Sequence, residues 1–284
     1  MQKFKNLAYL VAVSLLLFSC GEYQKVLNKG TVEDQYKMAV KMYESQKFGK
    51  AIRLFEKITP AYRGKPQMER IQFMVAQSNF NEKNYQTAGY YFDRFAKNYP
   101  TSSKLEEASF ASALSYKLAS PEFSKDPTDT EKALESFQSF INAFPTSDKL
   151  EEANKHYKEL RYKLQKKYFE IAKTYYTTAD YDMRNYKAAI QAFDNLLEDY
   201  LGSEFKEEAL YYRLKAAHDF TLKSYDRRKP ERIKDAMEAY EKLIRNYPET
   251  KFKTEVDKMV AKLQKEKERI DDLIAKSKEL EDSK

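Results

Sequence analysis

The residue whose type and position most clearly predict chemistry is Cys20, the single cysteine of the 284-residue chain. Two lysines near the N-terminus precede an apolar run from Leu7 to Phe18 that is too short to span a bilayer comfortably, and Ser19 adds a small residue before the cysteine. This order is typical of a secretory signal that ends in a lipobox, whose cysteine thiol receives a diacylglycerol. We therefore expect cleavage after Ser19 and lipidation of Cys20. An ordinary secretory signal with an incidental cysteine is the alternative.

Both histidines stand beside carboxylates, the pairing that general acid–base chemistry uses. His156 follows Glu152 by four residues, and His218 directly precedes Asp219. The sequence has no GxSxG, HExxH or glycine-rich phosphate motif, and it holds only six glycines. We interpret the histidines as packing or surface residues and expect no catalytic residue, no metal site and no cofactor. A single cysteine also excludes an internal disulfide and any multi-cysteine metal site.

Composition and charge favour a helical protein that does not bind nucleic acid. Lys, Glu, Tyr and Phe are abundant, whereas Gly and Pro number six and eight. Signal cleavage lowers the formal net charge from +7 to +5, because Lys3 and Lys5 are removed. Lysines and glutamates alternate along most segments, which is typical of solvated helix faces rather than of one basic stripe.

A frame of four residues recurs five times and predicts the helices that must position any binding residue. Each copy has an Ala followed by large apolar residues four, seven and eleven positions later, which places all four on one helix face. The aromatic anchors recur at intervals of 37, 45, 56 and 47 residues. The copies are Ala51-Phe55-Ile58-Tyr62, Ala88-Phe92-Phe95-Tyr99, Ala133-Phe137-Phe140-Phe144, Ala189-Phe193-Leu196-Tyr200 and Ala236-Tyr240-Leu243-Tyr247.

The residues after each frame predict a helix end, a turn and a new helix. Pro follows the last aromatic in three copies, where it cannot continue a helix. A hydroxyl two residues farther on can accept a hydrogen bond from the first amides of the next helix, and acidic residues then favour its first turn. Thr128 with Glu131 predicts a capping box after an inserted loop. The hydroxyl residues are Ser102, Ser147, Ser203 and Thr250, and the acidic ones are Glu106, Glu151 and Glu207.

These offsets resemble the tetratricopeptide repeat. We expect an all-α fold, a right-handed solenoid of five tetratricopeptide-like helix pairs with a C-terminal capping helix. The expected domains are a lipoprotein signal peptide (1–19), a lipidated tether (20–31), five repeats (32–250), and a capping helix with a charged tail (251–284). For residues 271–284 a frayed polar tail is favoured over a helix that awaits a partner.

The order of these features resembles the BamD family, lipoproteins of the outer-membrane β-barrel assembly machine. The resemblance rests on the lipobox, the five long repeats, the loop with Asp126-Pro127 between YPTS and FPTSDKLEEA, and the segment Leu160–Glu170, which resembles the family's long linking helix. It implies a lipid-anchored protein of the outer membrane that faces the periplasm. Its C-terminal repeats would dock on a BamA-like barrel protein, and its N-terminal repeats would meet unfolded β-barrel substrates.

The groove of a helical solenoid binds peptides or partner domains more naturally than it catalyses a reaction. We take three residues as candidates for partner binding, Tyr211, Tyr212 and Lys215, and three as candidates for a substrate groove, Tyr36, Phe73 and Phe80.

Two other function classes remain as alternatives. One is another cell-envelope repeat lipoprotein, which scaffolds wall enzymes or serves nutrient uptake, although the uptake type usually carries glycan-stacking tryptophans and this chain has none. The other is a wall-cleaving enzyme, which would need an appended catalytic domain, whereas 34 residues follow Thr250.

Overall fold

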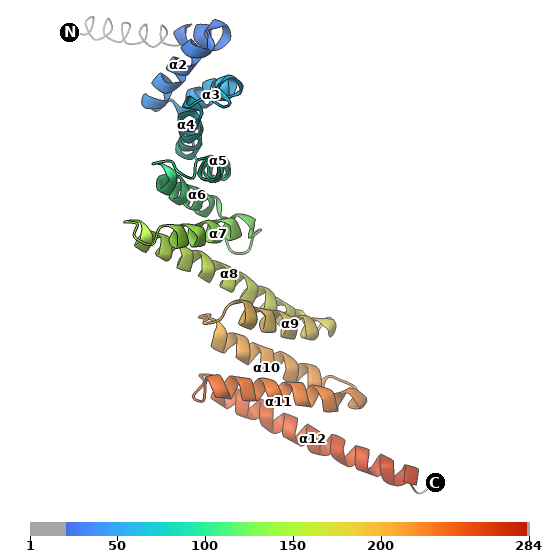
Figure 1. Cartoon of the computed structure of the whole chain (residues 1–284). Helices are drawn as coiled ribbons and strands as arrows, with labels where there is room; N and C mark the ends of the chain where they lie inside the picture. The colour runs from blue at the N-terminus through green and yellow to red at the C-terminus, as the bar shows by residue number, and fades with distance from the viewer. Residues whose placement is uncertain (1–20, 283–284) are drawn as a thin grey trace, which may run out of the picture. The chain divides into compact units, whose positions relative to one another are not determined.

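The computed structural model describes residues 21–282, so Cys20 and its signal lie outside the described residues. Successive antiparallel helix pairs make up this part of the chain, and it holds no strand (Figure 1). The pairs are α2 (Val32–Glu44) with α3 (Phe48–Tyr62), α4 (Gln67–Asn81) with α5 (Tyr85–Asn98), α6 (Leu105–Ala119) with α7 (Thr128–Ala143), α8 (Leu150–Thr178) with α9 (Arg184–Asp199), and α10 (Lys206–Leu222) with α11 (Lys229–Asn246). A short 3-10 helix, η1 (Asp226–Arg228), precedes α11, and α12 (Lys253–Asp282) follows it.

The second helix of every pair carries one copy of the four-residue frame. The frame Ala is 0% exposed in all five copies. Its small side chain lets a neighbouring helix approach closely and cover it. The following aromatic or aliphatic residues fill the pair cores. The predicted all-α, tetratricopeptide-like repeat fold is therefore confirmed, whereas the handedness of the solenoid stays a prediction.

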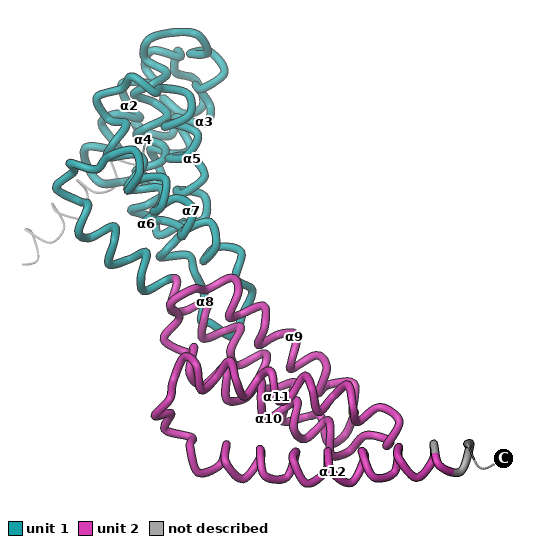
Figure 2. Tube along the Cα trace, turned by 60° about the horizontal axis from the view of Figure 1, so that its bottom comes forward, with its two compact units in different colours: residues 1–160 teal, residues 161–284 magenta. Residues whose placement is uncertain are grey.

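The chain divides into two compact units, residues 1–160 and 161–284 (Figure 2). The boundary falls within α8, whose 29 residues match the long helix that the family resemblance implied. In unit 1 three cores fill the first three pairs. In unit 2 one large core contains residues from α8 through α12, and a smaller one is formed by Ala217, Ala236 and Leu263.

The turns between pairs contain the predicted hydroxyl acceptors. Ser102 Oγ accepts from the amide of Lys104 at 3.0 Å, and Ser147 and Ser203 repeat this contact at 3.0 and 3.1 Å. Each hydroxyl also donates to a side chain of a preceding helix, in the first turn of α4, α6 or α10 or in the middle of α8, a contact that the spacing of the residues does not reveal. These hydroxyl latches join Ser102 to Glu69 (2.6 Å), Ser147 to Glu106 (2.5 Å), Ser203 to Gln165 (2.9 Å) and Thr250 to Glu207 (2.6 Å).

The predicted capping box at Thr128 and Glu131 is wrong, because α7 begins at Thr128 itself. The amide of Thr128 donates to Asp126 Oδ1 at 2.8 Å, so the loop carboxylate takes the capping role. A capping box does form at the start of α2, where the side chain of Thr31 accepts from the amide of Asp34 and the Asp34 carboxylate accepts from Thr31.

The two ends of the described chain are more helical than the sequence predicted. Residues 21–29, expected as part of a tether, form a helix whose Tyr23 is only 3% exposed in the core of the first pair. At the other end α12 continues to Asp282, so residues 271–282 are helical rather than frayed, and that this helix awaits a partner stays a prediction. Within the described residues, no helix combines the length and the apolar character needed to cross a bilayer.

Candidate partner-binding surfaces

The partner-binding candidates of α10 lie mostly inside unit 2. Tyr211 is 3% exposed, and its ring stacks on Phe252 with centroids 3.9 Å apart and an interplanar angle of 11°. Its hydroxyl donates to Glu255 of α12. Tyr212 is half-buried and stacks on Phe193. Tyr211 therefore offers a partner almost no surface, and its direct role is to fix α12 on α10.

Lys215 connects this aromatic layer to a buried polar cluster. Its Nζ donates to the Tyr211 hydroxyl at 3.2 Å and lies 5.9 Å from the ring centroid of Tyr176. The Tyr176 hydroxyl donates to Asp219 Oδ2 at 2.7 Å, and His218 Nδ1 lies 2.7 Å from Asp219 Oδ1. The three candidates thus belong to a cluster that packs α8, α10 and α12 together, and contact with a partner stays a prediction for Tyr212 and Lys215.

The electrostatics of this cluster follow from burial and hydrogen bonding. Burial, and then the bond to Asp219, raise the pKa of Tyr176. Burial, and then the bond to Glu255, raise the pKa of Tyr211 in the same way. Burial alone would raise the pKa of Asp219, but the bonds from His218 and Tyr176 outweigh it and lower that pKa. Asp219 is therefore a fixed anion that orients its neighbours.

Both histidines pack against neighbouring side chains. His218 is 4% exposed, and its Nε2 finds no hydrogen-bond partner among the described residues. His156 packs against Phe137 with ring centroids 5.4 Å apart and contacts Lys117 Nζ through Nδ1 at 2.5 Å. Both positions agree with the predicted packing role. Within residues 21–282, no group of three or more potential metal-ligating side chains is assembled.

The substrate-groove candidates are half-buried at the edges of the unit 1 cores. Phe73 packs edge-on against Phe92 and Phe95, with centroids 5.9 and 5.4 Å away. Phe80 contacts Tyr85, and Tyr36 contacts Tyr62. These rings present only part of their surface, so their contact with a substrate stays a prediction.

Unit 1 also has open clefts where the first helix of a pair is recessed between two second helices. One cleft of about 420 Å³ lies among α5, α6 and α7, and a smaller one of about 350 Å³ lies among α3, α4 and α5. The larger cleft is lined by four serines, together with Tyr116 and Phe140. Hydroxyl groups can form hydrogen bonds with the unpaired backbone groups of an extended chain, and aromatic rings beside them can pack against its side chains. The serines are Ser109, Ser112, Ser136 and Ser139.

The most exposed apolar surface of unit 2 lies in its turns and on α12. Tyr181, in the α8–α9 turn, is 93% exposed, and Tyr225, in the α10–α11 turn, is 83% exposed. Because the helices alternate in direction, these two turns lie at the same end of unit 2 (Figure 1). Leu273 and Ile274 of α12, each 43% exposed, line a hollow of about 320 Å³ with Pro230.

We call the exposed residues Tyr225, Pro230, Leu273 and Ile274, together with Ile270, which lines the hollow but is only 3% exposed, the C-terminal apolar patch. A cleft of about 450 Å³ between α11 and α12 continues it, lined by Ile233 and Met237 among others. Aromatic and aliphatic side chains beside a cleft are typical of protein–protein contact surfaces.

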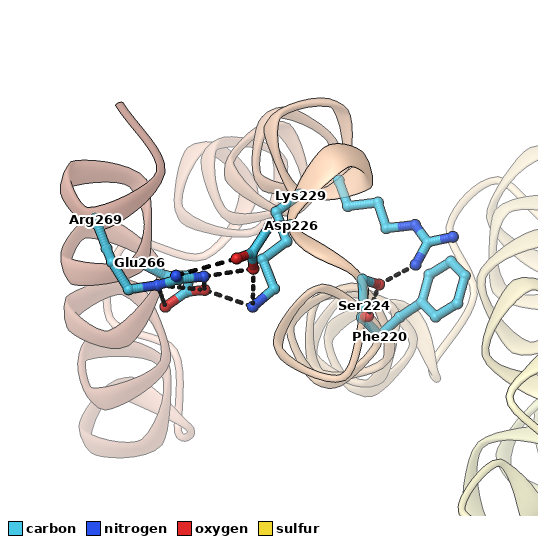
Figure 3. A network of polar contacts seen from close by, with 7 residues as sticks. Phe220, Ser224, Asp226, Lys229, Glu266 and Arg269 are labelled. Carbon is cyan, nitrogen blue, oxygen red and sulfur yellow. Dashed lines mark hydrogen bonds and ion pairs between the residues drawn. The ribbon is translucent and has the colours of Figure 1, made fainter. Parts of the chain in front are cut away.

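An ionic network fixes η1 on α12 next to this patch (Figure 3). Lys229, only 8% exposed, pairs with Glu266 at 2.6 Å and with Asp226 at 3.2 Å. Arg269 Nη2 reaches Asp226 at 2.5 Å and Glu266 at 2.7 Å. Hydrogen bonds from Arg269, and then from Lys229, lower the pKa of both carboxyl groups. The patch is therefore held on a rigid support rather than on a loose helix end.

Comparison with known proteins identifies a matching family. A family model named YfiO and described as "Outer membrane lipoprotein" matches residues 28–229 and 179–276. A protein of Aquifex aeolicus (strain VF5) that bears the name "Putative outer membrane protein assembly factor BamD" is 25% identical over 137 residues. That alignment covers 46% of this chain and 43% of the relative, so it spans less than half of the relative's length.

Two solved structures give weaker likenesses. The structure "TPR2AB-domain:pHSP90-complex of yeast Sti1" is 14% identical, with 82% of this chain and 98% of that chain covered and a TM-score of 0.35. The "DHF58 filament" is 15% identical, with 94% and 97% covered and a TM-score of 0.16. The repeat fold is established by the helix pairs themselves and not by these scores.

Proposed function

This chain belongs to the YfiO family of outer membrane lipoproteins, and on that premise we propose that it is a lipid-anchored, periplasmic scaffold of the machinery that assembles β-barrel proteins in the outer membrane. The partial similarity to the BamD relative supports this role. Cys20, which lies outside the described residues, is the one cysteine that can carry the acyl groups. No step of this function requires a reaction catalysed by the chain, which acts by binding.

The observation that carries the proposal beyond family membership is the C-terminal apolar patch. Tyr225 is 83% exposed and directly precedes Asp226 and Arg227, which line the same hollow as Leu273 and Ile274. The Lys229–Glu266 pair fixes the surrounding backbone. An aromatic anchor beside an apolar cleft supplies the water-excluded centre of a stable protein contact. We assign this patch to a folded partner, the periplasmic domains of a BamA-like barrel protein.

Unit 1 supplies the surface that we assign to unfolded β-barrel substrates. An extended barrel segment carries unpaired backbone amides and carbonyls together with alternating aromatic side chains. The serine-lined cleft among α5, α6 and α7 offers the hydroxyls of Ser109, Ser136 and Ser139 for the backbone, with Tyr116 and Phe140 in its wall, whereas the buried Ser112 hydroxyl already donates to the carbonyl oxygen of Gly89. Phe73, Phe80 and Tyr36 lie on other helices of the same unit and would add aromatic contacts where their rings reach the surface.

The test is affinity purification of the lipidated protein from gently solubilised envelopes, with identification and quantification of what copurifies. We expect an outer-membrane barrel protein with tandem periplasmic domains, near one to one. Replacing Leu273 and Ile274 together by Glu should reduce its recovery by at least about tenfold, because two charges would be desolvated in the contact.

The matched control replaces Val32 and Leu118 of unit 1 by Glu, since these are 42% and 45% exposed and therefore equally accessible. Recovery should then stay at the wild-type level. If both variants retain the barrel protein equally, the apolar patch is not the docking surface. If wall enzymes or a nutrient transporter are recovered in its place, the assembly role is wrong, and one of the other envelope functions applies.

A further inference from the structure

The helix formed by residues 21–29 is locked onto the first helix pair. Tyr23 is 3% exposed, and its hydroxyl donates to the carbonyl oxygen of Lys50 at 3.3 Å. At the end of this helix, the carbonyl oxygen of Leu27 accepts from Gln35 Nε2 at 3.1 Å and from Lys57 Nζ. The helix is therefore part of the folded repeat and not a free linker.

Five cations gather on and beside this helix. Two stand on its exposed side, and three come from α3 at offsets of zero, three and seven, so the latter share one helix face. Lys50 Nζ lies 5.0 Å from the ring centroid of Tyr23. Burial raises the pKa of Tyr23, and the charge of nearby Arg53 opposes that rise. We call this surface the basic face; it consists of Lys25, Lys29, Lys50, Arg53 and Lys57.

The basic face has little compensating negative charge. None of its five members forms an ion pair with a carboxylate among residues 21–282. Glu22, on the same helix, is engaged by Lys41 at 3.3 Å. Glu56 of α3 lines the cleft toward α4 and α5 instead. The face therefore presents net positive charge to whatever lies against it.

The position of the lipid anchor indicates what lies against the basic face. In an outer membrane lipoprotein of this family the acyl groups are carried by Cys20, because the chain has no other cysteine. The helix has begun by Gly21, and one residue spans at most about 3.6 Å of chain. There is thus no linker between the acylated residue and the basic face, which must stay within reach of the lipid headgroups.

We propose that the basic face binds the phosphate groups of anionic phospholipids and holds the first helix pair against the membrane surface. The anchor supplies the apolar attachment, and the five cations supply the second, electrostatic one. Each Lys or Arg close to an anionic surface strengthens binding about fivefold, and this attraction fades within about 8 Å at physiological salt. The inference rests on family membership and not on the proposed assembly role.

Vesicle binding tests the face without the anchor. The mature chain, residues 20–284 with Cys20→Ser, is sedimented with vesicles of phosphatidylcholine, alone or with phosphatidylglycerol. We expect binding only to the anionic vesicles, weakening as salt rises. Lys25→Gln, Lys29→Gln and Arg53→Gln together should weaken it about 100-fold. These three side chains are exposed, so the fold should persist, which circular dichroism checks.

The matched control is Lys242→Gln, Lys262→Gln and Lys265→Gln. It removes the same charge from exposed positions of unit 2 whose side chains form no ion pair with a described carboxylate. Its binding should change by no more than about twofold. Equal losses in both triple variants would mean that only overall charge matters, and absence of binding to anionic vesicles would also overturn the proposal.

Energy transfer tests the lipidated protein in vesicles. Because Cys20 is acylated, a cysteine introduced at exposed Asn28 is the single free thiol and can carry a fluorophore. Transfer to a headgroup-labelled lipid should be efficient there and weaker from Asn142→Cys in α7. It should fall in the basic-face triple variant and persist when ten Gly/Ser residues are inserted after Cys20. Unchanged transfer in the triple variant would show that the anchor alone sets the position.

Discussion

At the scale of single residues, the turn hydroxyls do two things at once. Each accepts from the backbone of its own turn and donates to a side chain of the preceding helix pair, as Ser203 does with Phe205 and Gln165. The sequence showed the first contact, because it is local. The second joins residues about forty positions apart and depends on the packing of two helix pairs, so spacing alone could not reveal it.

Replacing Ser203 by Ala tests the strength of one latch. Gln165 is only 6% exposed, so its Oε1 would lose its donor without gaining water, which costs about 1–3 kcal/mol. Urea unfolding should show this as a lower free energy of unfolding. Ser277→Ala on the exposed side of α12 is the control and should change stability by less than about 0.5 kcal/mol. Equal effects would contradict the latch.

Gly89 of α5 tests a close approach between helices. A Cβ there would lie 2.9 Å from the ring of Tyr116, which is 9% exposed and has little room to move. Gly89→Ala should therefore destabilise the protein by about 1–2 kcal/mol, although Ala favours a helix. Gly49→Ala in α3 is the matched control, because its Cβ would meet only the Glu82 carboxylate at 3.6 Å. That variant should be neutral or stabilised in thermal unfolding.

At the scale of elements, α12 is attached by the Lys229 network and by its buried apolar side chains, which are Val256, Met259, Val260, Leu263 and Ile270. Glu266→Gln leaves the ammonium of Lys229, which is nearly buried, without its closest carboxylate, and we expect a loss of about 2–4 kcal/mol in the docking of α12. Hydrogen exchange of the α12 amides measures it. Asp272→Asn breaks an exposed pair with Lys276 and should cost less than about 1 kcal/mol. Similar exchange in both variants would mean that the network does not hold the helix.

The same network sets a pH dependence. The folded-state pKa values of Asp226 and Glu266 are lowered, by Arg269 first and then by Lys229. Groups of this kind contribute stability above their unfolded pKa values, and the contribution is lost as pH falls through the folded ones. Exchange of the α12 amides, taken relative to the rate of an unfolded chain at the same pH, should therefore accelerate below about pH 4 in the wild type. In Glu266→Gln the acceleration should be smaller, and an acceleration of equal size would point to other carboxylates.

The elements themselves were largely predictable from the sequence. The Ala frame located the second helix of all five pairs, because a 3.6-residue period and a small contact residue are local properties. The end of α12 and the helix at residues 21–29 were missed, since both contain many charged residues and gain their stability from packing by Tyr23 and Ile270.

The sites were less predictable. Tyr211 was expected to reach a partner but stacks on Phe252, because adjacent tyrosines do not reveal which one faces inward. The basic face was missed because its cations come from two segments.

At the scale of the whole molecule, the division into two units bears on whether the chain unfolds cooperatively. Stability in a repeat array is approximately a sum of repeat and nearest-neighbour terms. Phe55 in unit 1 and Phe193 in unit 2 occupy the same frame position and are both 0% exposed. Replacing either by Ala should cost about 3–5 kcal/mol, because a large cavity opens in its pair core.

The two losses should appear in different places, and native-state hydrogen exchange can locate them. Phe55→Ala should reduce protection in α2, α3 and α4 and leave α9, α10 and α11 near their wild-type values, because no core cluster contains residues of both sets. Phe193→Ala should do the reverse. If each variant lowered protection equally throughout residues 21–282, the chain would unfold as one cooperative body. Local losses would instead mean that the proposed substrate contact by unit 1 and the proposed partner docking by unit 2 can be altered separately by mutation.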